Sequence, residues 1–178
     1  KPATPGMEDR MGVILQAHVD MVPQKNNDVE HDFKKDPIKP RIVDNMVYAT
    51  GTTLGADNGL GCAVSMAVRE SKDMVHGPIE VLITIDEETG MTGARALKPG
   101  LLNGDILINL DSETEGELYV GCAGGMDASA EFTYTTEAVP AGWVGKVLNV
   151  KGLVGGHSGM DIILYRANAN KVMARALL

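Results

Sequence analysis

Histidine and acidic side chains follow apolar runs of the chain at points where strands are expected to end. His18 and Asp20 come directly after the apolar run 12–17, and side chains two positions apart on extended backbone point the same way. His18 can therefore ligate a metal while Asp20 orients its ring. Asp111 follows the apolar run 106–110 and offers a further oxygen ligand. Each of these patterns, taken singly, is also common in surface turns.

The glycine-rich segment 51–61, GTTLGADNGLG, places Asp57 just ahead of an expected helix. In one interpretation Asp57 is an acid at the helix N-terminus that accepts backbone N–H bonds. In the other it is a metal-bridging carboxylate, because the surrounding glycines keep bulky side chains away from it. The segment lacks the Lys-Ser/Thr ending of a phosphate-binding P-loop, so it is not one.

Consecutive acids, Asp86, Glu87 and Glu88, follow the most apolar expected strand. Their mutual repulsion is unfavourable unless cations or hydrogen bonds compensate it. Adjacent side chains on extended backbone diverge, so one of Glu87 and Glu88 can bind a metal while the other handles the proton of an activated water. The alternative is a solvated acidic turn.

The candidate ligands share one position in the predicted fold. Each stands at a strand end or a strand-to-helix junction, where open α/β sheets place their ligand sites. A mixed shell of imidazole and carboxylate groups suits Zn²⁺, with Mn²⁺ or Co²⁺ as substitutes. The predicted metal ligands are His18, Asp57, Glu88 and Asp111.

Another candidate, His157, lies in the run GGHSG at 155–159. Glycines on both sides hold it on a turn and leave it exposed, which suits a hydrogen bond to a ligand. The alternative is a tight hairpin with an incidental histidine.

The elements that must position these residues alternate along the first part of the chain. Apolar runs predict buried strands and helical spacing predicts the helices between them, while the proline-rich, charged segment 23–45 is expected to be an irregular loop. Strands alternating with helices indicate an α/β fold with a mostly parallel sheet and flanking helices. The predicted strands are 12–17, 79–85 and 106–110, and the predicted helices are 58–69 and 92–98.

The pattern changes after about Gly125. Apolar and polar residues alternate over 127–134 and again over 146–151, which predicts strands of an antiparallel sheet with one wet face. The glycine-rich run 121–125 between the two patterns is a plausible boundary. We therefore expect one domain at 1–124 and the beginning of a second, α+β domain at 125–178.

Composition excludes several functions. Lys and Arg number 16 against 24 Asp and Glu, giving a net charge of −8, and this balance argues against a nucleic-acid or anionic-membrane partner. Two cysteines are too few for a disulfide framework or a structural zinc site. No stretch is long and apolar enough to span a bilayer. We expect a cytoplasmic protein in a reducing compartment.

The motifs together resemble the di-zinc metallopeptidases of the M20 clan, most nearly the bacterial aminoacyl-histidine dipeptidases. The blocks that carry the resemblance agree in order over nearly the whole chain. They are LQAHVDMVPQKN (15–26), GTTLGADNGLG (51–61), TIDEETGM (84–91), NLDSETEGELYVGCAGG (109–125) and VGGHSGMDI (154–162).

The resemblance implies a role for each metal ligand. His18 would ligate one of two zinc ions and Asp57 would bridge both, while Glu88 and Asp111 would each complete the shell of a different zinc. The implied reaction is hydrolysis of unblocked dipeptides, including Xaa-His substrates such as carnosine.

The resemblance also implies the residues that act on the substrate. Asp20 would orient His18, and Glu87 would be the general base. His157 would be the lid histidine that helps stabilise the tetrahedral oxyanion, often across a dimer. The second domain would then be the start of a lid that also forms a homodimer.

One departure from the family pattern bears on activity. The family's last metal ligand is a histidine beyond the lid, and no histidine of this chain stands in a matching motif. We therefore expect an internal piece of a longer dipeptidase that is inactive by itself. The alternatives are an N-acyl amino acid amidohydrolase of the same clan and a non-catalytic binding or assembly fragment.

Overall fold

The chain divides into two compact units, Lys1–Gly124 and Gly125–Leu178, in the computed structural model. The structure describes residues 1–122, 124–126, 128–157, 159 and 161–178. Four residues of the motifs and patterns above lie outside the described residues: Ala123, Asp127, Ser158 and Met160.

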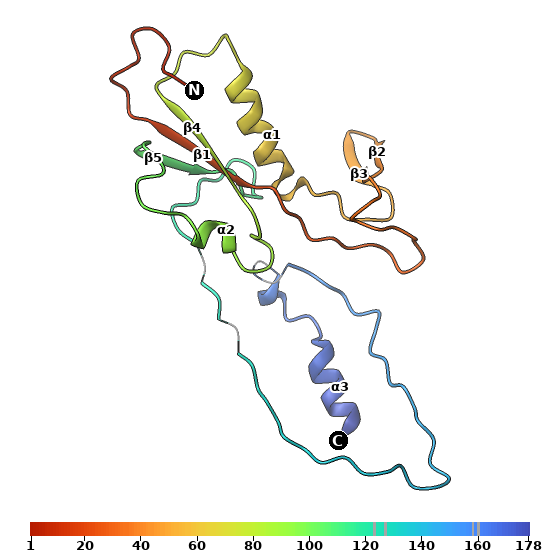
Figure 1. Ribbon diagram of the computed structural model, residues 1–178. Helices are drawn as coiled ribbons and strands as arrows, with labels where there is room; N and C mark the ends of the chain where they lie inside the picture. Colours follow the sequence, from red (N-terminus) through yellow and green to blue (C-terminus); the bar gives the residue numbers. More distant parts are fainter. Residues whose placement is uncertain (123, 127, 158, 160) are drawn as a thin grey trace. The chain divides into compact units, whose positions relative to one another are not determined.

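The first unit is built on a three-stranded parallel sheet with the strand order β4-β1-β5. The strands are β1 (Val13–His18), β4 (Ile79–Thr84) and β5 (Ile106–Asn109), and Figure 1 shows β1 between the other two. Val13 pairs with Ile79 on one side and with Ile106 on the other. The predicted α/β fold with a parallel sheet is confirmed, and each strand lies within one residue of its predicted bounds.

The central strand β1 carries most of the buried core. Ile14, Leu15 and Ala17 are buried, together with Ile79 at the start of β4. His18, the last residue of β1, is also buried and pairs with Thr84 at the end of β4. A buried, titratable side chain therefore ends the central strand.

Helix α1 (Ala56–Glu70) packs against β1 and β4. Its buried residues are Asn58, Gly61 and Ser65, which lie on one face because they recur at helical spacing. The apolar residues expected to face the core do not all do so, since Leu60 and Val64 are exposed. Small residues take the inner face because the helix comes very close to the residue after β5, where a Cβ on Gly61 would lie 2.9 Å from the Leu110 carbonyl oxygen.

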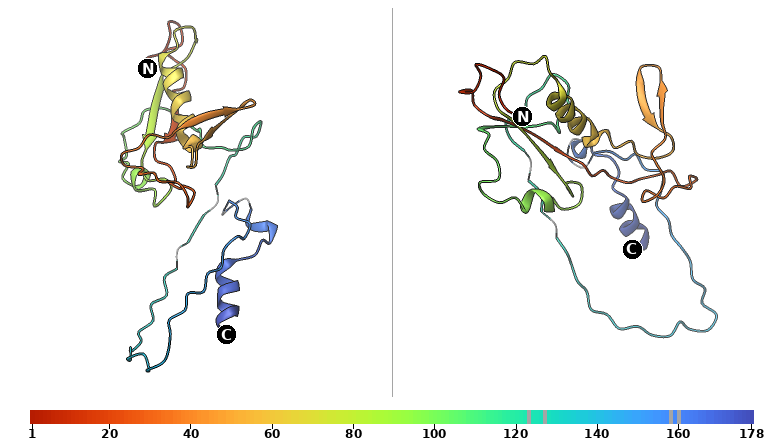
Figure 2. Two further views of the ribbon diagram at one scale, coloured as in Figure 1. Left: turned by 90° about the vertical axis from the view of Figure 1, so that its right-hand side faces the viewer. Right: turned by 45° about the horizontal axis from the view of Figure 1, so that its top comes forward.

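A β-hairpin interrupts the segment expected to be an irregular loop. Strands β2 (Pro40–Val43) and β3 (Met46–Ala49) pair antiparallel, and the views of Figure 2 show this hairpin projecting away from the sheet. The expectation of no regular element up to residue 45 is therefore wrong. Proline is tolerated at the first residue of an edge strand, and Asp44 adopts the positive φ of 54° that a tight hairpin turn uses.

The remaining helix of the first unit is short. Helix α2 (Thr92–Arg95) begins where predicted and ends before the predicted residue 98. None of the helices in the described part of the chain combines the length and apolar character needed to cross a membrane.

The second unit has little regular structure. It contains a 3-10 helix, η1 (Ile162–Leu164), and helix α3 (Ala169–Leu177). The strands expected over 127–134 and 146–151 are wrong for the residues described there, which form no ladder. Alternation alone does not make a strand, because the backbone needs a partner to accept and donate its hydrogen bonds. Asn168 is the N-cap of α3, and its side chain accepts a hydrogen bond from the Lys171 backbone N–H.

Candidate metal centre

The predicted ligands of the first unit converge at one edge of its sheet. His18 ends β1, Glu87 and Glu88 follow β4, and Asp111 follows β5. The carboxyl ends of parallel strands meet at the same edge, which explains why residues far apart in sequence come together. Asp57, in the first turn of α1, approaches from the neighbouring layer.

His18 is fixed by the segment that follows it. The side chain is 1% exposed, and its Nδ1 lies 3.0 Å from the backbone carbonyl oxygen of Asp20 and 3.4 Å from the Asp20 carboxylate. Since a carbonyl oxygen only accepts, Nδ1 carries the hydrogen and donates it. Nε2 is then the ring nitrogen that faces the carboxylates, and once it is deprotonated it can ligate a metal.

Asp57 and Asp111 flank this nitrogen. The Oδ1 atoms of Asp57 and Asp111 lie 3.1 and 3.6 Å from His18 Nε2. The potential ligand atoms of these three residues all lie within 4.8 Å of one another. The N-cap of α1 is Gly55, and Asp57 lies in the first turn of the helix, as the interpretation of an acid at the helix N-terminus expects.

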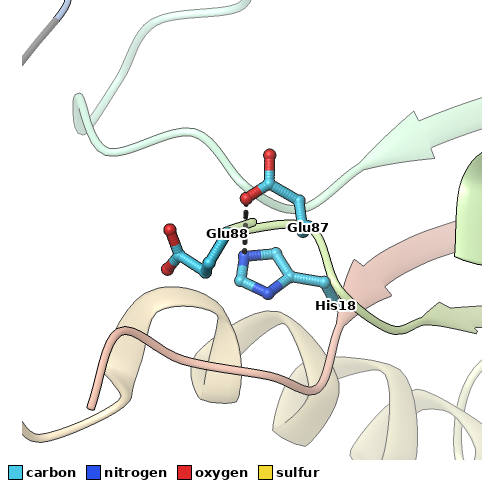
Figure 3. Close-up of side chains that lie close together, drawn as sticks. All are labelled: His18, Glu87 and Glu88. Carbon is cyan, nitrogen blue, oxygen red and sulfur yellow. Dashed lines mark ion pairs between the residues drawn. The ribbon is translucent and has the colours of Figure 1, made fainter. Parts of the chain in front are cut away.

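Glu87 and Glu88 close the other side of the imidazole. Figure 3 shows their side chains diverging around the His18 ring, with the Glu87 carboxylate over Nε2. Glu87 Oε2 lies 3.9 Å from that nitrogen, and His18, Glu87 and Glu88 form a second group whose potential ligand atoms lie within 4.8 Å of one another. The divergence expected for neighbouring residues is present.

Asp20 joins the ends of the two neighbouring strands. Its Oδ1 accepts a hydrogen bond from the Glu87 backbone N–H at 3.1 Å, and its Oδ2 accepts one from the Glu88 N–H at 3.2 Å. One carboxylate therefore contacts the His18 ring and holds the backbone of both glutamates.

Asp86 takes no part in this cluster. Its carboxylate accepts hydrogen bonds from the hydroxyl groups of Thr89 and Thr92, and these two bonds, Thr89 first, lower the pKa of Asp86. The acidic run therefore separates into one residue that stabilises the following turn and two that face the histidine.

The carboxylates set the proton affinity of His18. Burial by itself lowers the pKa of His18, but the surrounding acids, Asp111 foremost, outweigh burial and raise the pKa above 6.5. For Asp20, burial by itself raises the pKa, but the backbone N–H groups of Glu87 and Glu88 prevail and lower it.

The two outer acids respond in the opposite direction. Burial and the negative charges of Asp57 and Glu87 raise the pKa of Glu88. Burial is also the main cause that raises the pKa of Asp111, although a hydrogen bond from Asn58 works against it. Both shifts arise mainly from burial, and for both acids the negative charge of Asp57 adds to the effect of burial.

The donor set fits a divalent metal. Within the described ranges, no lysine or arginine pairs with the acids around His18. A buried imidazole nitrogen and several carboxylate oxygens are ligands that Zn²⁺, Mn²⁺ and Co²⁺ accept. A cation at Nε2 would neutralise the repulsion among the carboxylates.

Sequence reasoning missed the amides that support this centre. Asn58 donates to Asp111 and to the Leu110 carbonyl oxygen, and Asn109 Oδ1 accepts from the Asp111 backbone N–H at 3.0 Å. Asn109 stands two residues before Asp111, the same spacing that linked His18 with Asp20. Applying that spacing to Asp111 would have identified Asn109 as a supporting residue.

A cavity of about 230 Å³ adjoins the cluster, with Glu87 and Asp111 in its wall. Most of the other lining residues are apolar, among them Leu82, Ile85 and Met91. An apolar group held there would lie beside the two carboxylates.

His157 belongs to the second unit and is described by its local contacts. Its backbone N–H donates to Asp161 Oδ2 at 2.9 Å, and its Nδ1 accepts from the Gly159 N–H at 3.0 Å. Arg166 Nη1 lies 3.1 Å from the same Asp161 oxygen. These contacts hold His157 next to Asp161, and the described residues of 155–159 include no strand.

The fold and the cluster together define an α/β protein with a candidate metal centre at the carboxyl edge of a parallel sheet. A sequence model of the peptidase family M20/M25/M40 matches residues 14–142. The chain belongs to this family.

Relatives with sequence and structural similarity agree. The chain is 58% identical over 177 residues to the cytosol non-specific dipeptidase of Escherichia coli (strain K12). It is 36% identical to the Bacillus subtilis (strain 168) protein YqjE over 80 residues, which are 43% of this chain and 22% of that protein. It resembles the crystal structure of aminoacylhistidine dipeptidase from Vibrio alginolyticus with a TM-score of 0.68 and 54% identity. It covers 36% of the length of both dipeptidases, while 99% of this chain is matched.

Proposed function

We propose that the full-length protein containing this chain hydrolyses unblocked dipeptides, including Xaa-His substrates such as carnosine. The observation that carries the proposal is the meeting of His18 Nε2 with the Asp57 and Asp111 carboxylates at 3.1 and 3.6 Å. The similarity to two proteins named as dipeptidases supports the substrate class.

The residues of the cluster would hold two zinc ions. His18 and Asp111 would ligate one ion, Glu88 would ligate the other, and Asp57 would bridge them. Asp57 is suited to the bridging position because its carboxylate lies close to His18 on one side and raises the pKa of Glu88 through its charge on the other. The remaining ligand of the second ion would be the family's distal histidine, so the 178-residue chain by itself is expected to be inactive.

Bound zinc would polarise the peptide carbonyl and favour deprotonation of a nearby water. Glu87 would take the proton of that water and deliver it to the leaving amine. Its position supports this role, since its side chain is 36% exposed and its Oε2 stands 3.9 Å from His18 Nε2. It is therefore close to the ligands and still accessible to a substrate.

Asp20 would act on the reaction through other residues. It would keep the His18 ring in the tautomer whose Nε2 is free for a metal, and its two backbone hydrogen bonds would hold Glu87 and Glu88 in register.

His157 would stabilise the oxyanion of the tetrahedral intermediate. Because Nδ1 accepts the Gly159 N–H, the neutral ring carries its hydrogen on Nε2 and can donate it to an oxyanion. We propose that residues 1–124 are part of the catalytic domain and that residues 125–178 begin a lid domain through which the protein forms a homodimer.

We also place the full-length protein in the cytoplasm. The E. coli relative is named as a cytosol enzyme, and Cys62 and Cys122 are both free thiols, as expected in a reducing compartment.

The test combines metal analysis with a paired substrate assay on the full-length protein. We expect two zinc equivalents per chain and faster cleavage of β-Ala-His than of N-acetyl amino acids. Preferred cleavage of N-acetyl amino acids would establish the amidohydrolase alternative instead. Absence of both metal and hydrolysis would favour a binding or assembly role.

A further inference from the structure

We infer that Asn58 is a positioning residue that holds the Asp111 carboxylate in place for metal binding. The inference rests on the proposed metal centre and adds a residue to it. It also explains why residue 61 is a glycine.

The side chain of Asn58 spans two acceptors next to the cluster. It is 3% exposed, and its Nδ2 donates to Asp111 Oδ1 at 2.6 Å and to the Leu110 carbonyl oxygen at 2.8 Å. A carboxylate and a carbonyl oxygen only accept, so the amide nitrogen must face them. The orientation of the Asn58 amide is therefore fixed by its neighbours.

The amide oxygen of Asn58 adds little to the hydrogen bonding of this side chain. Its Oδ1 is buried and has no hydrogen-bond partner among the residues that the structure describes. In a buried amide, both the oxygen and the NH2 group normally form hydrogen bonds. In Asn58 only the NH2 group does, so donation by that group is the role of this side chain.

Gly61 makes room for this arrangement one turn along α1. A Cβ at position 61 would collide with Asn58 Oδ1 and would lie 2.9 Å from the Leu110 carbonyl oxygen. Any larger residue there would displace the amide from both of its acceptors. The glycine and the asparagine thus form one local unit.

Asp111 is held from two directions as a result. Its carboxylate receives the Asn58 N–H, and its backbone N–H donates to Asn109 Oδ1. The oxygen that Asn58 contacts is also the one that lies 3.6 Å from His18 Nε2. Asn58 therefore acts on the atom that faces the proposed metal position.

An amide suits this supporting position because it is neutral. Asp57 and Asp111 repel each other, and a hydrogen bond keeps Asp111 close without adding a positive charge. A lysine or arginine in the same place would neutralise the carboxylates and compete with the metal for them. Supporting hydrogen bonds of this kind typically change metal affinity about 10- to 100-fold.

The test compares metal binding of full-length wild type, Asn58→Asp and Asn58→Ala. Asn58→Asp keeps the size of the side chain but replaces the donor with a negative charge, whereas Asn58→Ala removes the donor without adding a charge, so an effect common to both variants reports the lost hydrogen bond. We expect both variants to lose about 10- to 100-fold in affinity for one metal equivalent in a competitive chelator titration. We also expect an altered visible absorption spectrum of the Co²⁺-loaded protein, and partial recovery of kcat at excess zinc.

Ser65→Ala is the matched control, since Ser65 is buried on the same face of α1 and makes no contact with the cluster in the interactions above. Its metal affinity and Co²⁺ spectrum should equal those of wild type. Folded Asn58 variants with wild-type affinity and spectrum would overturn the role of Asn58 while leaving the proposed function intact. A wild-type protein that binds no metal would overturn both.

Discussion

His18 Nε2 and Asp57 Oδ1 lie 3.1 Å apart although 39 positions separate the two residues in sequence. The contact joins the end of the central strand to the first turn of α1. It brings the proposed terminal ligand of one metal next to the proposed bridge between both.

Replacing the bridge should affect both metal positions at once. In the full-length protein, Asp57→Asn keeps the shape of the side chain and removes one negative charge. We therefore expect loss of at least one metal equivalent and about a 100-fold or larger fall in kcat. Elemental analysis and β-Ala-His hydrolysis measure the two effects. Asp9→Asn, a charge removal at an exposed position, is the control, and a fully metallated, active Asp57→Asn protein would contradict the bridging role.

Replacing the proposed base should leave the metals bound. In the full-length protein, Glu87→Gln retains the size of the side chain but cannot accept a proton, so we expect kcat to fall about 100- to 10,000-fold with little change in metal content. Glu70→Gln, at the exposed end of α1, should behave as wild type. Wild-type kcat in Glu87→Gln would show that another group moves the proton.

Removing the metal should abolish activity reversibly. Prolonged dialysis against a chelator is expected to yield an inactive protein with a retained circular dichroism spectrum, because the sheet under the site has its own apolar core. Activity should return on adding Zn²⁺ or Co²⁺. Unchanged hydrolysis in protein shown to be metal-free would rule out the metal-dependent mechanism.

Glu80 should make stability depend on pH. The Asn103 backbone N–H is the first cause that lowers the pKa of Glu80 below 4.5, and the Gly104 N–H and Asn103 side chain add to it. A carboxylate with a lowered pKa in the folded state stabilises the fold above its unfolded pKa and loses this contribution as pH falls through the folded value. Glu80→Gln should therefore lower the urea midpoint at pH 7, and the difference from wild type should shrink towards pH 3.

The same urea titrations with Glu70→Gln control for the loss of one negative charge. A difference between Glu80→Gln and wild type that stays constant from pH 7 to pH 3 would show that these hydrogen bonds do not depend on ionisation of Glu80.

The central strand should not tolerate a larger side chain. Ala17 is completely buried, so Ala17→Leu must displace its neighbours and should lower the free energy of unfolding by about 1–3 kcal/mol. Ala63→Leu adds the same volume at an exposed position of α1 and should change it by less than about 0.5 kcal/mol. Chemical denaturation measures both, and equal effects would show that Ala17 has free space around it.

Sequence patterns predicted the parts of the fold that depend on burial. Runs rich in apolar residues are typical of the strands of a parallel sheet, so β1 and β4 could be located to within a residue. The acids after those strands could be located too, because a strand end in a parallel sheet determines which residues meet.

The predictions that were wrong concern parts of the fold that depend on hydrogen-bond partners or on backbone geometry. The β2–β3 hairpin is held by cross-strand hydrogen bonds and by the conformation of Asp44, neither of which appears in hydrophobic periodicity. The inner face of α1 departs from hydrophobic periodicity because the polar Ser65 is buried on it while Leu60 and Val64 are exposed. Asn58 escaped notice because its role is visible only once Leu110 and Asp111 are seen beside it.

The order of the strands has a consequence for how such a site can diversify. Because the cluster is assembled from the ends of β1, β4 and β5 and the start of α1, the long connections between these elements supply none of its proposed ligands. The hairpin segment 40–49 and the connection 96–105 can change in length or composition while the edge of the sheet stays as it is. A chain built this way can acquire new substrate preferences through its loops and keep one unchanging metal chemistry beneath them.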